Sequence, residues 1–150
     1  MKIVRKEVKK GEPLLNLSVD ACITTLLEVS KDSASDLIQG FTENGPFKYF
    51  EESFNGKFNI TYPLNVIVEE KVENIYTIGE LLWEIAQTYK KIYEEELTTT
   101  TIEVGQMSEN LINRNQTDGK YGIWGHDIGD LVFEGISIYD NGTVDIFIGS

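Results

Sequence analysis

The residues best suited to chemistry lie in a glycine-rich stretch, residues 118–130, near the end of the 150-residue chain. This stretch contains the only histidine of the chain, His126, followed by Asp127 and Asp130. Imidazole and carboxylate groups are common ligands of divalent metals, so these three side chains are the candidate metal ligands. A stable metal site usually requires a further ligand from another segment. Beyond this candidate ion, we expect no cofactor.

His126 is also the candidate general base of an active site, with Asp127 as the carboxylate that would orient it and a serine or threonine as the nucleophile. No G-x-S-x-G or comparable nucleophile motif accompanies the pair. The four glycines of the stretch would let the backbone approach a phosphate, but neither common glycine pattern for phosphate binding is present. We therefore expect the imidazole to secure a turn.

A second group of residues suits protein recognition. Its members are either carboxylates at the end of a predicted helix or aromatic residues beside an apolar face. They are Trp83, Glu94, Glu95, Glu96, Tyr121 and Trp124. Consecutive carboxylates at a helix C-terminus oppose the helix dipole, so we expect either a solvated last turn or a cluster that attracts cations.

The net charge narrows the range of partners. The chain carries 25 acidic and 13 basic side chains, for a net charge of −12. Five of the basic residues and one acidic residue fall within residues 1–10, which leaves 8 basic and 24 acidic residues in the remainder. Such a body repels nucleic-acid phosphates and anionic lipids, so neither nucleic acid nor a membrane surface is an expected partner. A basic protein is favoured instead.

The length of the chain predicts a single domain over residues 1–150, in which residues 1–10 form a basic arm or an edge strand. No apolar run is long enough for a secretory signal or a membrane span, and a cytoplasmic location is expected. The lone cysteine, Cys22, cannot form an internal disulfide and lies on an apolar stripe, so we expect it to be inert.

Hydrophobic periodicity predicts several helices. The clearest begins with a capping box at residues 77–80, Thr-Ile-Gly-Glu, and keeps one apolar face for about four turns. Shorter helices are predicted from Ser18 and from Ser33. Residues 46–56 fit a helix with Phe50 and Phe54 on one side, although Phe54-Asn55-Gly56-Lys57 is also typical of a hairpin turn.

Alternating side chains predict the strands. Residues 58–68 alternate on both sides of Pro63, which indicates one long strand with an edge position or a bulge at the proline. Residues 97–104 are rich in β-branched residues and predict another strand.

The clearest hairpin lies within the last thirty residues, where a three-residue loop at residues 140–142 would pair Tyr139 with Thr143. This pairing requires a positive φ at Gly142, where glycine costs least. It also places the apolar residues of both strands on one face. These residues are Val132, Ile136, Ile138, Val144, Ile146 and Ile148.

Together these elements predict an α+β fold, with an antiparallel sheet of about four or five strands, helices packed mainly on one face and a C-terminal β-hairpin. For function, we expect a small acidic cytoplasmic binding protein that engages a basic protein partner, as an inhibitor or an immunity protein would. The alternative is a small hydrolase or ligand-binding enzyme with its site in the loop of residues 121–130.

Overall fold

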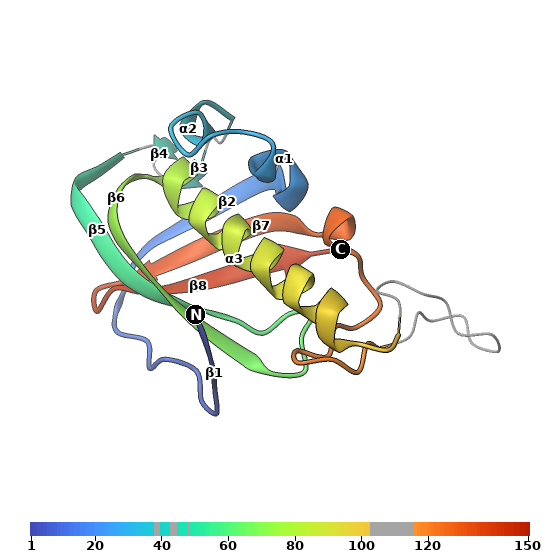
Figure 1. Cartoon of the computed structure of the whole chain (residues 1–150). Helices are drawn as coiled ribbons and strands as arrows, with labels where there is room; N and C mark the ends of the chain where they lie inside the picture. The colour runs from blue at the N-terminus through green and yellow to red at the C-terminus, as the bar shows by residue number, and fades with distance from the viewer. Residues whose placement is uncertain (38–39, 43–44, 48, 103–115) are drawn as a thin grey trace.

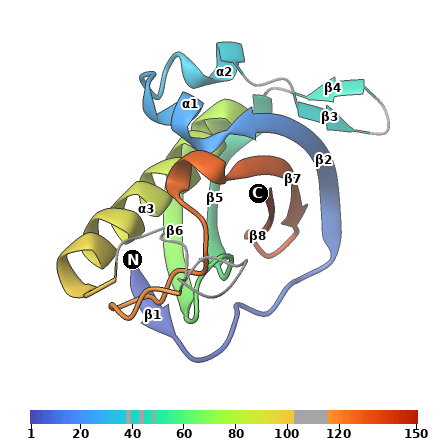
Figure 2. The same ribbon diagram turned by 90° about the vertical axis from the view of Figure 1, so that its right-hand side faces the viewer.

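The structure is a computed structural model that describes residues 1–37, 40–42, 45–47, 49–102 and 116–150. Within these residues the fold is α+β, with a curved sheet of eight strands in the order β1-β6-β5-β8-β7-β2-β3-β4. A long helix, α3 (Ile78–Thr99), crosses one face of the sheet (Figure 1), and the curvature of the strands is clearest in the second view (Figure 2).

The strands differ widely in length, and one neighbouring pair runs in parallel. The strands are β1 (Lys2–Val4), β2 (Pro13–Cys22), β3 (Gly40–Thr42), β4 (Gly45–Phe47), β5 (Tyr49–Ile60), β6 (Ile67–Thr77), β7 (Val132–Tyr139) and β8 (Thr143–Gly149). All neighbours are antiparallel except β5 and β8. The predicted α+β class is therefore confirmed, whereas the sheet is mixed and larger than expected.

Helix α3 forms as its sequence predicts. The Thr77 hydroxyl oxygen accepts a hydrogen bond from the Glu80 amide at 3.0 Å, which caps the first turn. The helix continues through Thr99 and residues 100–102 are irregular, so the strand predicted for residues 97–104 is wrong over residues 97–102. The Thr98 and Thr99 hydroxyls donate to the Glu95 carbonyl oxygen, which satisfies their polar groups within the helix. Residues 103 and 104 lie outside the described residues.

Three other sequence predictions are corrected by long-range pairing. The helix predicted from Ser18 is the second half of β2, which pairs with β7, and only α1 (Ile23–Leu27) is helical there. The long strand predicted for residues 58–68 is divided between β5 and β6, because Pro63 has no amide to donate to a ladder and the chain reverses there. Residues 49–56 are a strand and not a helix. The predicted helix from Ser33 is present as α2 (Ala34–Leu37).

The C-terminal hairpin has the predicted loop. Ile138 lies opposite Val144, so Tyr139 and Thr143 close the three-residue loop, and Gly142 has a φ of +82°. One prediction within the hairpin is wrong. A register shift between Phe133 and Gly135 moves the inward-facing position by one residue. Phe133 rather than Val132 is therefore fully buried.

A single core joins the helix and the sheet. It contains residues of α1, α3 and the long strands, and its largest fully buried side chains include Tyr89, Tyr121, Phe58, Phe133, Leu81, Leu82 and Ile85. The short helices α1 and α2 pack beside α3, and Gly79 lies directly against Ala34 and Ser35. None of the helices formed by the described residues is long and apolar enough to cross a membrane.

The basic N-terminal segment lies along the acidic body. Strand β1 forms one edge of the sheet, where the Lys2 ammonium lies 3.2 Å from a Glu69 carboxylate oxygen. Further along, Lys10 is 2.8 Å from Asp145, and this hydrogen bond raises the Lys10 pKa. Part of the positive charge near the N-terminus is thus paired within the molecule.

Replacing Gly142 with alanine should destabilise the hairpin. An L-residue at positive φ costs roughly 1–2 kcal/mol, and the added Cβ would lie 3.0 Å from the Asn55 carbonyl oxygen. We expect urea unfolding to show a loss of about that size. Gly129→Ala is the matched control, because its Cβ would meet no atom within 4 Å. An equal loss in both variants would contradict the role of the loop.

Candidate functional site

The candidate site is the loop of residues 116–130, which folds against the last turns of α3. Its anchor is Glu96, whose side chain is fully buried. The carboxylate accepts four hydrogen bonds from this loop. The donors are the Thr117 hydroxyl at 2.5 Å and the amides of Tyr121 at 2.8 Å, Gly119 at 3.1 Å and Gly122 at 3.2 Å. A buried carboxylate is costly unless its oxygens are hydrogen-bonded, and these donors supply that compensation.

Two glycines of the loop, Gly119 and Gly122, therefore serve an anion that belongs to the same chain. At Gly119 a Cβ would lie 2.6 Å from a Glu96 oxygen, so only glycine permits this approach. The converging amides resemble the nests that bind phosphates, but here Glu96 occupies them. Glu96 is thus a structural anchor and not the surface group expected from the sequence.

The neighbouring carboxylate, Glu95, holds the outer side of the same loop. It accepts a hydrogen bond from the Tyr121 hydroxyl and lies 3.1 Å from the Lys120 ammonium. These two hydrogen bonds lower the Glu95 pKa. Burial is the main cause that raises the pKa of Tyr121, and the hydrogen bond to Glu95 raises this pKa further. With 1% of its surface exposed, Tyr121 is a core residue and cannot serve as a docking ring.

A third carboxylate ties the start of the loop to the end of α3. Asp118 accepts hydrogen bonds from the Thr101 amide and the Thr100 hydroxyl, each at 2.7 Å, and also from the Thr101 hydroxyl. These bonds, led by that of the Thr101 hydroxyl, lower the Asp118 pKa to about 2. Asp118 is therefore ionised at any neutral pH and remains in contact with solvent.

His126 makes one hydrogen bond through its backbone carbonyl and one through its ring. Its carbonyl oxygen accepts a hydrogen bond from the buried Tyr93 hydroxyl at 2.8 Å. The imidazole is partly exposed, with Nε2 3.2 Å from the Ser150 hydroxyl oxygen. That hydroxyl in turn lies 2.8 Å from the Tyr62 hydroxyl. The ring thus contacts Ser150, directly after the end of β8, while the backbone carries the bond to α3.

Asp127 and Asp130 form a reciprocal cap on a short 3-10 helix, η1 (Ile128–Asp130). Asp127 Oδ1 accepts from the Ile128 amide at 2.8 Å, and Asp130 Oδ2 accepts from the Asp127 amide at 3.1 Å. The distance from Asp130 Oδ2 to His126 Nδ1 is 3.9 Å, beyond hydrogen-bonding range. Over the described part of the chain, no group of three His, Cys, Asp or Glu side chains is arranged to hold a metal ion.

The loop presents one large aromatic side chain to solvent. Trp124 is 53% exposed, and its amide donates to the Pro63 carbonyl oxygen at 2.8 Å. The neighbouring Tyr62 is 41% exposed, and its ring centroid lies 6.0 Å from that of His126. Tyr62 was missed by sequence reasoning, because no local pattern connects it with a loop sixty residues further along the chain.

The surface continues from the loop onto α3. A small cleft of about 230 Å³ lies between Leu97, Tyr93, Glu94 and Asp127, and Leu97 at its edge is 62% exposed. Glu94 is exposed and 4.0 Å from Lys90. We call Tyr62, Leu97, Trp124, Glu94 and Asp127 the loop face.

Trp83 does not belong to this surface. Its indole N–H donates to the Val29 carbonyl oxygen at 3.0 Å, and its ring packs partly against the core. Lys31 lies 6.0 Å from the ring centroid. Trp83 therefore joins α3 to the segment between α1 and α2, as boundary tryptophans commonly do.

Comparison with protein-family models, with curated proteins and with solved structures found no match to this chain.

The loop combines a fixed backbone with an exposed aromatic ring. The backbone of the loop is fixed at Glu96, Glu95 and Asp118, so the Trp124 ring projects from an ordered support. An imidazole beside a hydroxyl is also present, but the nearest aspartate does not orient it. The fixed backbone beneath Trp124 would favour binding, because a surface that is already ordered loses little conformational entropy when it meets a partner.

Replacing Glu96 with glutamine should release the loop from α3. An amide keeps one accepting oxygen and turns its NH2 group towards backbone donors, so several donors lose their partner. We expect a loss of roughly 2–4 kcal/mol in the free energy of unfolding. Urea denaturation measures it, with Glu94→Gln as the exposed control on the same helical turn. If both variants are as stable as the wild type, Glu96 is not the anchor.

Proposed function

We propose that this protein is a binding protein whose acidic surface engages a basic protein partner, as an inhibitor or an immunity protein does. The contact would be made by the loop face, with the exposed Trp124 ring as its central anchor. The observation that carries the proposal is the exposure of this ring on a loop that is tied to a buried carboxylate.

The composition of the loop face supports a protein ligand. Tryptophan and tyrosine dominate the energetics of many protein interfaces, because they bury a large area at a small cost in side-chain entropy. Trp124, Tyr62 and Leu97 supply apolar area, and each is more than 40% exposed.

The charges around these residues support a basic partner in particular. Glu94 and Asp127 are exposed beside the apolar residues, and Asp118 stays ionised on the same loop. The chain as a whole carries a net charge of −12. Such a field accelerates the encounter with a positively charged protein and excludes acidic competitors.

The test is affinity capture from a lysate of the source organism on immobilised protein, at about 50 and about 500 mM NaCl. We expect a basic protein to be retained at low salt and largely lost at high salt. Trp124→Ala should retain at least about tenfold less of it, since a central aromatic contributes roughly 2 kcal/mol or more. Quantitative mass spectrometry measures the retained protein.

The matched control is Tyr76→Ala. Tyr76 is 55% exposed, as Trp124 is, but it lies at the end of β6 next to the start of α3, away from the loop face. Its removal should leave capture unchanged. Retention that is insensitive to salt, or equally weakened in both variants, contradicts the proposal.

A second candidate, a small hydrolase, is favoured by one observation, the 3.2 Å distance between the Ser150 hydroxyl oxygen and His126 Nε2. An effective triad requires the third group to hydrogen-bond the imidazole, and Asp130 at 3.9 Å does not. Asp127, the partner expected from the sequence, caps η1 instead.

The two candidates differ in the effect of Ser150→Ala on ester hydrolysis. We expect wild type and variant to hydrolyse p-nitrophenyl acetate at equal rates, both near the rate of free imidazole. A serine nucleophile would instead cause a drop of at least about a hundredfold. Stopped-flow absorbance measures the rate, and a burst phase that disappears in the variant would establish the hydrolase.

A further inference from the structure

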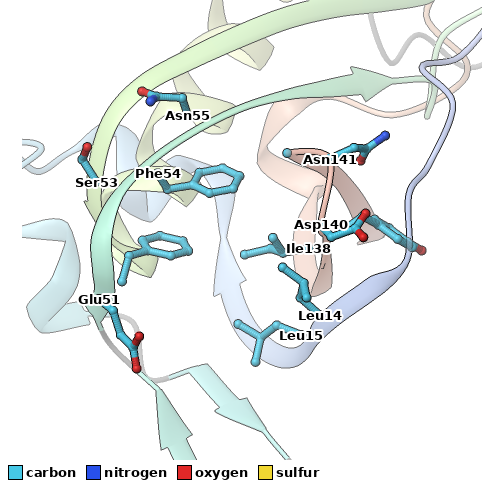
Figure 3. Close-up of a pocket in the computed structure, with 12 residues that line it drawn as sticks. Leu14, Leu15, Glu51, Ser53, Phe54, Asn55, Ile138, Asp140 and Asn141 are labelled. Carbon is cyan, nitrogen blue, oxygen red and sulfur yellow. The ribbon is translucent and has the colours of Figure 1, made fainter.

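An open cavity of about 910 Å³ lies at the far side of the molecule from the loop face. It is bounded by the first half of β5, the start of β2 and the turn between β7 and β8 (Figure 3). Strand β8 pairs with β5 only at Lys57 and Phe58. The first half of β5 therefore passes beyond the hairpin turn, and a gap opens between β5 and the paired strands β2 and β7.

One wall of the cavity is a pair of stacked rings. The ring centroids of Phe50 and Phe54 are 4.9 Å apart and nearly parallel. Residues four apart in a regular strand are separated by roughly 13 Å. Here the register shifts between Tyr49 and Phe54, and this bulge shortens the strand and brings the rings together. Bulges often re-aim side chains at binding sites.

The opposite wall is aliphatic. Leu14 and Leu15 of β2 and Ile138 of β7 face the two rings across the cavity (Figure 3). Ile138 is buried at 3% exposure, while Leu14 is 68% exposed. The cavity thus runs from the core to solvent between an aromatic and an aliphatic wall.

The mouth of the cavity carries negative charge. Glu51 and Asp140 both line it, and Asp140 uses Oδ1 to accept the Glu12 amide at 2.8 Å. Glu51 is exposed. Lys10, whose ammonium lies 5.9 Å from the centroid of the Tyr139 ring, is paired with Asp145.

We propose that this cavity binds a small organic cation, an amine with an aromatic or aliphatic body. The body lies between the phenylalanine and leucine walls, and the ammonium group lies at the mouth on the Glu51 side, while Asp140 stands on the opposite side of the cavity (Figure 3). The cavity volume lies within the range of roughly 300–1,000 Å³ that is typical of small-molecule sites. An ammonium beside the Phe54 ring would also gain a cation–π contact.

The proposal concerns a site separate from the loop face. The cavity is built by β2, β5 and the β7–β8 turn, whereas the loop face belongs to α3 and residues 116–130. A failure of one proposal therefore leaves the other intact.

Two fluorescent dyes of similar size and opposite charge provide the test. Thioflavin T is an aromatic cation, and 1-anilinonaphthalene-8-sulfonate is an aromatic anion. We expect thioflavin T to bind the purified wild-type protein with one saturable site at micromolar concentration. The anionic dye should bind at least about tenfold more weakly, because the rim carboxylates repel it.

Variants then locate the site. Glu51→Gln should weaken thioflavin T binding by about threefold to tenfold, as expected for a partly exposed ion pair. Glu52→Gln is the matched control, because this neighbouring acidic residue does not line the cavity. Leu14→Lys places an ammonium at the mouth, at a position that is mostly exposed. It should weaken binding of the cationic dye and strengthen binding of the anionic one.

Three results would overturn the proposal. The first is the absence of saturable thioflavin T binding, and the second is equal or stronger binding of the anionic dye. The third is thioflavin T binding that Glu51→Gln and Leu14→Lys leave unchanged while Trp124→Ala removes it, since the dye would then occupy the loop face. Circular dichroism of each variant verifies that the fold is retained.

Discussion

The structure near the candidate site depends on one buried carboxylate. Moving a carboxylate out of water costs several kcal/mol, and hydrogen bonds to a charged group each return roughly 1.5–3 kcal/mol. Glu96 accepts four of them, all from residues 117–122. The loop therefore follows a path on which its amides converge on this side chain. The exposed position of Trp124 follows from that path.

Several acidic residues hold the fold together, and some of them also face solvent. Glu95, Glu96 and Asp118 hold the loop, and Asp127 and Asp130 cap η1. Glu69 of β6 and Asp145 of β8 form ion pairs with Lys2 and Lys10 of the basic N-terminal segment. The surplus of negative charge is thus partly engaged in internal contacts, while Glu94, Asp118 and Asp127 remain exposed.

Two irregular strands determine which side chains reach the surface. The bulge in β5 stacks Phe50 on Phe54 beside the cavity, and the shift in β7 buries Phe133 in place of Val132. Both lie in strands whose neighbours are distant in sequence. The bulge in β5 thereby shapes the concave apolar wall beside the hairpin turn.

The sequence by itself determined the features that rest on local forces. The Thr77 cap, the apolar face of α3, the turn at Gly142 and the α+β class could all be predicted, because each depends on residues within a few positions of one another. The loop of residues 121–130 was also identified as the candidate site from its composition. Only the tertiary structure decided that residues 18–22 pair with β7, that Phe50 and Phe54 lie in a strand, and that Glu96 is buried while Trp124 is exposed. These outcomes depend on partners that are twenty to more than a hundred residues away, and no local pattern of side chains specifies which distant donors a carboxylate will meet.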